Sequence, residues 1–254
     1  MKPLICSCAL ILMIIINSGI CHSATMVQTP ASEISQEVVT RLSPEITQAM
    51  ENKALRLGAP IFMRIFKESD ELEIWVLQGS GFVLFKTYRI CDYSGDLGPK
   101  EKEGDKQSPE GFYRVGPAQL NPWSRFHLAF NLGYPNEYDR LNGRTGNALM
   151  VHGRCSSVGC FAMTDYRMEE IYTIADAALA NGQESFAVHI FPFRMTAENM
   201  RRHQDHQDGR WQRYWRNLKE GYDLFKRTAI PPEVAVDRDR YLFKATTIEL
   251  ARQP

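Results

Sequence analysis

One stretch decides the fold of this 254-residue chain: Val151-His152-Gly153-Arg154-Cys155-Ser156-Ser157-Val158-Gly159-Cys160-Phe161-Ala162-Met163-Thr164. It follows a short apolar run, residues 148–151, which is bounded by turn residues and predicts a buried strand. It ends at Thr164, where apolar residues begin to recur with the 3.6-residue period of a helix. The pattern therefore predicts that a strand and a helix hold His152 and Cys160 on either side of a short loop.

A cysteine and a histidine placed in this way form a candidate acyl-transfer centre. A thiol becomes an effective nucleophile only as the thiolate, and a nearby imidazole can accept its proton. The positive end of a helix that starts near Thr164 also favours the thiolate. Gly159 allows a tight turn, and backbone N–H groups near Gly159 and Cys160 can face a developing oxyanion. We therefore expect Cys160 as the nucleophile and His152 as the base.

Two other interpretations of this stretch remain open from the residues alone. The spacing His152-x2-Cys155-x4-Cys160 offers three zinc ligands, but a closed structural site needs a fourth, from His127 or Cys91. Alternatively, Cys160 is a buried structural thiol and His152 a core histidine with satisfied hydrogen bonds. The Cys/His interpretation requires no metal and no cofactor.

Outward from this stretch, the pattern predicts an α+β fold built mainly from antiparallel strands. Alternation and turn residues indicate strands over residues 61–67, 72–76, 82–90, 112–115, 126–132 and 186–191, with a final pair near Val234 and Tyr241. Helices are expected from Ser43-Pro44 to Gly58, from Thr164 to Gly182, after Thr196, and along an aromatic stripe from Trp211 to Phe225. Residues 25–43 are expected to be a linker. Loops 92–110 and 133–146 are long, and long loops often carry function.

Composition narrows the class of protein. Thirty Lys and Arg balance thirty Asp and Glu, and 44% of residues are hydrophobic. This balance argues against disorder and against nucleic acid as the main partner. Lys2 precedes an apolar run, residues 4–16, that is shorter than the ~20 residues of a membrane span. We therefore expect a signal peptide over residues 1–24, a periplasmic location and no membrane span in the mature protein; an uncleaved N-terminal anchor is the alternative.

Several blocks of the sequence resemble the catalytic domains of YkuD-type L,D-transpeptidases, and in particular the YafK branch of that family. The blocks are His152-Gly153, Ser157-Val158-Gly159-Cys160, Ser108-Pro109-Glu110-Gly111-Phe112-Tyr113, Tyr93-Ser94-Gly95-Asp96-Leu97-Gly98-Pro99-Lys100, Pro135-Asn136-Glu137-Tyr138-Asp139-Arg140, Gly159-Cys160-Phe161-Ala162-Met163-Thr164 and Phe191-Pro192-Phe193-Arg194-Met195-Thr196. They occur in order between about Ile61 and Tyr241.

The resemblance implies a β-sandwich-like catalytic domain, which we place at residues 59–195. A linker and N-terminal helix, residues 25–58, would precede the catalytic domain. A C-terminal helical extension, residues 196–254, would follow, and the terminal strands of this extension would pack on the catalytic domain. Cys160 would attack a peptide carbonyl beside meso-diaminopimelate in peptidoglycan stem peptides. His152 would be the general base and then the acid, with its ring oriented by the carbonyl of Gly153.

Two positions depart from the common family pattern. Many members carry a second histidine where this chain has Val158, and an arginine where it has Ala162. Both losses argue against ordinary 3–3 cross-linking. The YafK branch is similar in these departures and is linked to hydrolysis that releases an outer-membrane lipoprotein from peptidoglycan. That hydrolysis is the expected function; L,D-transpeptidation and a non-catalytic peptidoglycan-binding module are the alternatives.

Five further residues are expected to bind substrate. Tyr93, Arg140 and Arg154 lie in loops that this order of elements places around the site, and Ser157 and Gly159 belong to the motif itself. Stem peptides carry free carboxylates, and arginine can pair with a carboxylate through two hydrogen bonds.

The cysteine count leads to a separate prediction. Removal of the signal peptide leaves Cys91, Cys155 and Cys160, an odd number in an oxidising compartment. A bridge between Cys91 and Cys155 would leave Cys160 as the free thiol and would pin the loop that carries it. The alternatives are separately buried thiols, or a bridge between Cys155 and Cys160 that would inactivate the nucleophile.

Overall fold

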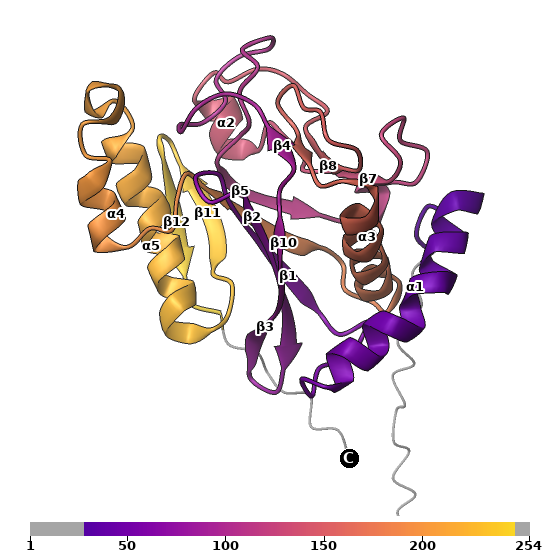
Figure 1. The fold of residues 1–254 in the computed structure, drawn as a ribbon. Helices are drawn as coiled ribbons and strands as arrows, with labels where there is room; N and C mark the ends of the chain where they lie inside the picture. The colour runs from indigo at the N-terminus through magenta and orange to yellow at the C-terminus, as the bar shows by residue number, and fades with distance from the viewer. Residues whose placement is uncertain (1–27, 247–254) are drawn as a thin grey trace, which may run out of the picture.

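The computed structural model describes residues 28–246 as two five-stranded β-sheets and a two-stranded hairpin, with helices around them (Figure 1). The expected α+β class with mainly antiparallel strands is confirmed, and the described part contains two parallel pairings, β1 with β10 and β8 with β9. The expected signal peptide, residues 1–24, lies outside the described residues. No helix within residues 28–246 is long and apolar enough to cross a bilayer.

The first sheet has five strands in the order β3-β2-β1-β10-β5. Their bounds are Ile61–Phe66 for β1, Glu71–Gln78 for β2, Gly81–Arg89 for β3, Gly111–Val115 for β5 and Phe186–Phe191 for β10. The sequence pattern predicted one buried face for the strand at 61–67, and this was wrong, because every residue of β1 is buried. Met63 and Ile65 face the main core, whereas Phe62 and Phe66 pack against the C-terminal elements on the other side.

The second sheet has shorter strands in the order β4-β9-β8-β7-β6. Their bounds are Asp92–Tyr93 for β4, Leu120–Asn121 for β6, Ala129–Asn131 for β7, Met150–His152 for β8 and Phe161–Ala162 for β9. The strand predicted at 126–132 shrinks to β7, and neither β4 nor β9 was predicted. Strands of two residues show no period, so only their neighbours in space can define them.

Five α-helices surround the sheets. They are α1 Glu33–Glu51, α2 Glu137–Leu141, α3 Asp165–Ala180, α4 Ala197–Arg202 and α5 Gln212–Thr228; two 3₁₀ turns, Pro117–Gln119 and His206–Gly209, and a hairpin of β11 Glu233–Asp237 and β12 Arg240–Lys244 complete the described part. The helix predicted from Thr164 is confirmed as α3, and it contributes buried residues to the core between the sheets. The Thr196 cap is confirmed for α4, since its side chain accepts a hydrogen bond from the N–H of Asn199.

The first helix begins earlier than the sequence predicted. Ser32 caps it, and Pro44, expected at the first helical position, lies inside α1. Ser43 is not a cap either, because its Oγ donates to the carbonyl of Val39 at 2.6 Å. Proline removes one helical N–H donor, but the buried stripe that includes Val38 and Leu42 packs into the main core. This packing keeps residues 33–43 helical, so the prediction of a linker there was wrong.

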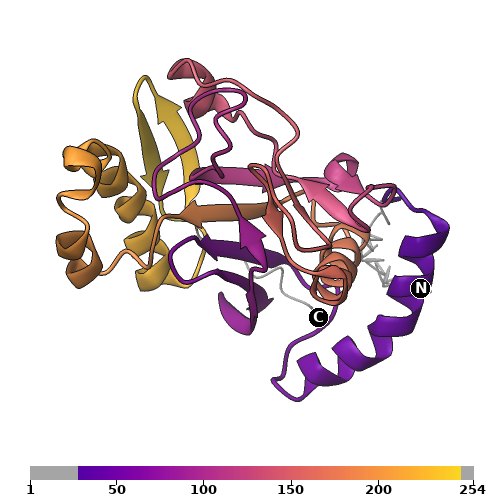
Figure 2. The ribbon, with the colours of Figure 1, turned by 45° about the horizontal axis from the view of Figure 1, so that its top comes forward.

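The C-terminal elements cover the outer face of the first sheet, at the opposite end of the molecule from α1 (Figures 1 and 2). The aromatic stripe of α5 packs inward as predicted: Trp215, Tyr222 and Phe225 are all buried. The rings of Phe225 and Phe62 lie 4.8 Å apart, which joins α5 to β1. The covered outer face explains why β1 is buried on both sides.

A buried lysine fixes the long loop 94–110. Lys67 follows β1, is fully buried, and donates to the carbonyls of Gly98 at 2.8 Å and Ser108 at 3.2 Å. It also pairs with Glu110, whose other carboxylate oxygen accepts from Trp215 Nε1 at 2.9 Å. A buried charge must be paired and hydrogen-bonded, and these contacts tie the loop to β1 and to α5.

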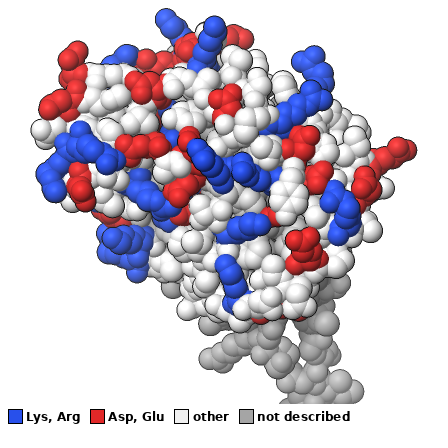
Figure 3. All heavy atoms as spheres, viewed as in Figure 1, with Lys and Arg blue, Asp and Glu red and all other residues white. Residues whose placement is uncertain are grey.

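Both signs of charge are interspersed over the face of the molecule in Figure 3. This view agrees with the zero net charge of the chain. On that face the distribution offers no extended positive stripe of the kind that a nucleic-acid backbone would need.

Candidate active site

The second sheet places the predicted catalytic pair. β8 and β9 are parallel neighbours, with Val151 beside Phe161 and His152 beside Ala162. Residues 153–160 therefore connect adjacent parallel strands, for which a dozen or more residues are usual. The chain makes this short connection with left-handed backbone at Arg154, φ 61°, and Gly159, φ 100°. Gly159 suits such a conformation because it has no Cβ.

A disulfide bridge pins this loop. Cys91 and Cys155 are joined, with their Cα atoms 5.4 Å apart, as predicted. Within residues 28–246, Cys160 is the cysteine that remains outside a disulfide. The bridge therefore leaves the expected nucleophile as a thiol.

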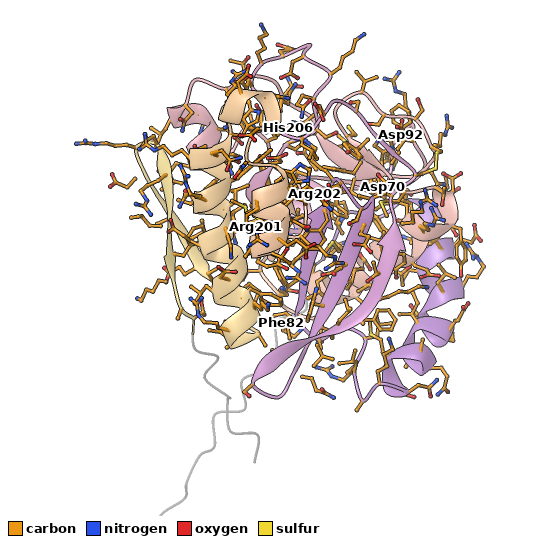
Figure 4. All side chains as sticks on the ribbon, turned by 60° about the vertical axis from the view of Figure 1, so that its left-hand side comes forward. Asp70, Phe82, Asp92, Arg201, Arg202 and His206 are labelled. Carbon is orange, nitrogen blue, oxygen red and sulfur yellow. A yellow bond between two sulfur atoms is a disulfide. The ribbon has the colours of Figure 1, made fainter. Side chains whose placement is uncertain are left out.

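Hydrogen bonds add to this anchor from the same neighbouring segment. The N–H of Ser157 donates to Asp92 Oδ2 at 2.7 Å, and the N–H of Gly159 donates to Ser94 Oγ. Asp92 lies at the loop-bearing end of the molecule, and Phe82, near the start of β3, lies at the other end (Figure 4). Segment 91–94 thus holds residues 153–160, which we call the catalytic loop, by one covalent bond and two hydrogen bonds.

The thiol of Cys160 is partly exposed and has few polar contacts. Its Sγ accepts a hydrogen bond from the N–H of Met150 at 3.4 Å and lies 3.9 Å from the carbonyl oxygen of Ala148. Burial raises the pKa of the Cys160 thiol, although the Met150 N–H and the charge of Lys100 pull that pKa down. The thiol is therefore protonated at neutral pH and needs a base to become a nucleophile.

His152 is in the state that a base requires. The imidazole is buried, and its Nδ1 lies 2.6 Å from the carbonyl oxygen of Gly153. A carbonyl oxygen only accepts, so Nδ1 carries the proton and Nε2 keeps a lone pair. Burial lowers the pKa of His152, while the Gly153 carbonyl raises it by a smaller amount. The ring of Phe126, whose centroid lies 4.7 Å away, contributes to this burial.

Gly153 leaves no room for a side chain. A Cβ built there would lie 2.7 Å from Asp165 Oδ1 and 2.8 Å from the carbonyl oxygen of Phe126. Asp165, the first residue of α3, also accepts from the N–H of Arg154 at 2.6 Å. The start of α3 therefore packs against the backbone that carries the Gly153 carbonyl.

Four of the five expected substrate-binding residues lie in or beside the catalytic loop, and Tyr93, Ser157 and Gly159 are three of them. Tyr93 belongs to β4, its ring lies 6.2 Å from that of Phe161, and burial raises the pKa of Tyr93 to about 12. Ser157 Oγ donates to the carbonyl of Cys160 at 2.7 Å. The N–H of Gly159, expected near the oxyanion, is already bonded to Ser94.

The two arginines occupy different places. Arg154 is exposed in the catalytic loop. Arg140 is exposed on α2, donates to the carbonyl of Pro135, and lines a cavity that contains none of the other expected site residues. The structure therefore places Arg154 with the candidate site and Arg140 apart from it.

Sequence reasoning missed three residues of loop 94–110 that support the site. Ser94 accepts the Gly159 N–H, and Ser108 Oγ donates to the carbonyl of Cys160 at 3.1 Å. Lys100, almost fully buried, lowers the pKa of Cys160 through its charge. All three lie in blocks that carry the family resemblance, but their residue types alone did not mark them as contacts of the catalytic loop.

The residues that a zinc site would use have other partners. Cys91 and Cys155 are joined to each other, and His127 Nε2 lies 2.8 Å from Glu169 Oε1. Between residues 28 and 246, no cluster of three or more histidine, cysteine and acidic side chains could hold a metal ion. The zinc interpretation of the His-x2-Cys-x4-Cys spacing has no fourth ligand in this arrangement.

Comparison with known proteins identifies the family of this chain. Residues 73–190 match the L,D-transpeptidase catalytic domain family, YkuD. The chain is 46% identical over 192 residues to the Escherichia coli K12 protein named "Putative L,D-transpeptidase YafK", which covers 76% of this chain and 77% of the relative. Among solved structures, the helical cell shape determining protein Pgp2 of Campylobacter jejuni is 15% identical, with 82% of each chain covered and a TM-score of 0.41. Bd1075 of Bdellovibrio bacteriovorus is 21% identical, with 68% of this chain and 62% of that chain covered and a TM-score of 0.38. The identity to the E. coli relative is high over most of both sequences, and the chain therefore belongs to the L,D-transpeptidase family with a YkuD catalytic domain.

Proposed function

We propose that this protein is a periplasmic cysteine hydrolase that cleaves the amide link between an envelope lipoprotein and meso-diaminopimelate in peptidoglycan. One observation carries the proposal: a neutral His152, whose Nδ1 proton is donated to the Gly153 carbonyl, directly precedes the pinned loop that ends at the free thiol of Cys160. Nucleophilic acyl transfer uses these two groups, a thiol and a base that can accept its proton. Membership of the L,D-transpeptidase family supports peptidoglycan as the substrate.

The reaction divides into two halves. His152 Nε2 takes the thiol proton, and Sγ attacks the carbonyl carbon of the diaminopimelate amide. The tetrahedral intermediate collapses, the C–N bond breaks, and the leaving amine receives the proton from His152. This leaves a thioester on Cys160. A water molecule then gives a proton to His152 and attacks the thioester, which releases the free carboxylate and returns the proton to sulfur.

The surroundings of the thiol favour water over a bulky amine acceptor as the second nucleophile. The position where many relatives carry a second histidine holds Val158, whose side chain is 71% exposed. Ala162, where many carry an arginine, is fully buried. Neither residue offers a polar group that could bind the carboxylate of an incoming stem peptide. An amine acceptor would therefore lack the polar groups that these two positions supply in many relatives, whereas water needs no such group.

The decisive experiment follows the fate of the thioester. Purified protein is incubated with peptidoglycan that carries covalently attached lipoprotein, with and without an added D-amino acid as amine acceptor, and the products are identified by mass spectrometry. Free carboxylate in both reactions, with none in the Cys160→Ala control, supports the hydrolase. Incorporation of the D-amino acid as the main product would show an L,D-transpeptidase instead. Sedimentation with peptidoglycan without turnover would show a binding module.

A further inference from the structure

A cavity has the features of a second ligand site. It lies on the face of the first sheet that the C-terminal elements cover. It has a volume of about 280 Å³ and lies between strands β5 and β10, the β11–β12 hairpin and α2. This volume is near the lower end of the ~300–1,000 Å³ that is usual for small-molecule sites. None of its lining residues belongs to the catalytic loop or contacts the Cys160 thiol.

The lining divides into an apolar interior and a charged rim. Phe112 and Tyr241 are buried in one hydrophobic cluster. Val234 and Val236 are partly buried and pack against this cluster. The exposed members of the lining include the charged residues Arg114, Glu137 and Arg140. An apolar interior with a few polar groups that converge on it is the usual composition of a small-molecule site.

A buried histidine in the lining has unused hydrogen-bonding capacity. His189 is 1% exposed, and its Nδ1 has no hydrogen-bond partner in the part of the chain that the structure describes. Its ring lies between those of Phe62 and Phe112, with both centroids at 4.6 Å. Burial lowers the pKa of His189 well below its ordinary value, so the ring is neutral. Since buried polar atoms are nearly always paired, an unpaired one beside a cavity points to a missing partner.

The charged groups of the rim are also unpaired. Glu137 and Arg140 lie three residues apart on α2, close enough for an ion pair within one helix. No ion pair joins them, and within residues 28–246 neither they nor Arg114 has an oppositely charged partner. Arg140 instead donates to the carbonyl of Pro135, and Arg114 donates to Ser185. One carboxylate and two guanidinium groups thus remain for a ligand.

We propose that this cavity binds a free α-amino acid with an apolar side chain. The ligand carboxylate would pair with Arg140, for which a guanidinium can supply two parallel hydrogen bonds. The ammonium group would pair with Glu137, and the side chain would lie against Phe112 and Val234. The ring of His189 lines the buried part of the site, next to the position of this side chain.

The test uses phenylalanine as the probe, because it carries both charges and an apolar ring. Isothermal titration calorimetry of the full protein should find saturable binding of L- or D-phenylalanine at millimolar concentration. N-Acetylphenylalanine lacks the ammonium group and phenylalaninamide lacks the carboxylate, so each should bind at least about tenfold more weakly, the factor for a loss of 1.4 kcal/mol. Arg140→Gln and Glu137→Gln should weaken binding of phenylalanine by a similar factor.

Two controls keep the test specific. Arg201→Gln removes an exposed arginine from α4, outside the cavity, and should leave the affinity unchanged. NMR should show the imidazole signals of His189 shifting with phenylalanine in proportion to the calorimetric saturation, while the signals of His203 stay in place. Absence of saturable binding, equal affinity for N-acetylphenylalanine, or equal loss in Arg201→Gln would each overturn the proposal.

Discussion

Two regions of the molecule are held in place by different forces: the catalytic loop, residues 153–160, and the C-terminal attachment, in which α5 packs on the first sheet. Residues 153–160 contain two glycines and two serines but little buried apolar surface, and they are fixed by a disulfide and by hydrogen bonds to segment 91–94. The attachment of α5 consists of fully or nearly buried aromatic side chains around the Lys67–Glu110 pair. The first region contains the thiol that the proposed reaction brings into contact with substrate, whereas the second contains none of the proposed catalytic residues.

The difference follows from what each region must do. A loop that buries its residues would also bury the nucleophile, so covalent and polar contacts must replace apolar packing there. The attachment can use burial, which stabilises in proportion to the apolar area removed from water. We therefore expect changes in the loop to alter reactivity and changes in the attachment to alter stability, and the following predictions test this separation.

The largest effect is expected from His152→Ala. Without its base, Cys160 would react only through the small fraction of thiolate that exists without assistance, because burial raises the pKa of the thiol. General base catalysis contributes about 10²–10⁴-fold, and turnover should fall by that factor. Stopped assays of peptidoglycan hydrolysis and the alkylation rate of Cys160 measure it. His203→Gln changes a histidine at the end of α4 that pairs with Glu68, and it is the control; equal rates in His152→Ala and wild type would remove the base from the mechanism.

The next prediction concerns stability. Trp215 is fully buried, and Trp215→Ala should lower the free energy of unfolding by about 3–5 kcal/mol, the usual cost of a large aromatic deletion in a core. Urea unfolding measures this change. Trp123→Ala is the matched control, because Trp123 is 67% exposed and a surface substitution changes stability by no more than about 0.5 kcal/mol.

The native alkylation rate of Cys160 in Trp215→Ala tests the comparison directly. The loop has its own anchors to segment 91–94, so the rate should stay within about threefold of wild type, less than the tenfold that 1.4 kcal/mol would give. A larger change would mean that the aromatic attachment also controls the site, through loop 94–110.

The disulfide should affect both properties. Cys91 and Cys155 are 64 residues apart. A disulfide typically stabilises the folded protein by about 2–4 kcal/mol, because it restricts the conformations of the unfolded chain. The Cys91→Ser/Cys155→Ser double variant should lose this amount in urea unfolding. Its turnover should fall by up to about 10²-fold, since a misplacement of ~1 Å can have that effect.

Reductant provides the control for that variant. Dithiothreitol should slow the wild-type enzyme toward the rate of the double variant and leave the double variant unchanged. If the double variant keeps wild-type turnover, hydrogen bonds alone position the loop and the bridge serves stability only.

Sequence reasoning placed the candidate site residues in the fold more accurately than it placed their surroundings, for physical reasons. His152, Gly153 and Cys160 lie within one short stretch, so local strand and helix signals were sufficient to place them. The pairing of Cys91 with Cys155 was one of three arrangements that the odd number of thiols left open, and the structure contains it. Arg140 could not be placed in this way, because its position depends on how loop 133–146 folds onto the outer face of the sheet.

Local signals also failed where tertiary contacts outweigh them. Ser43-Pro44 has the composition of a helix start, but α1 begins at Glu33 because its apolar stripe packs against the core. The strands β4 and β9 have two residues each, and their existence depends on pairing with each other. The buried face of β1 toward α5 was missed because the sequence of a strand does not reveal what covers it.

The smallest expected effect is a shift in pH dependence from Phe126→Ala. Burial lowers the pKa of His152, and the Phe126 ring, at 4.7 Å between centroids, supplies part of that burial. In the wild type His152 therefore stays neutral as the pH falls through ~6.5, the ordinary pKa of histidine. The acid limb of the pH profile of kcat/KM accordingly lies below that pH. Removal of the ring lets water reach the imidazole and favours its charged form, so the pKa rises toward the ordinary value and the acid limb moves to higher pH. Turnover above that limb should change little, because Nδ1 keeps its bond to the Gly153 carbonyl. The pH profile of kcat/KM measures the shift; an acid limb that stays in place or moves to lower pH would show that other atoms set the environment of the base.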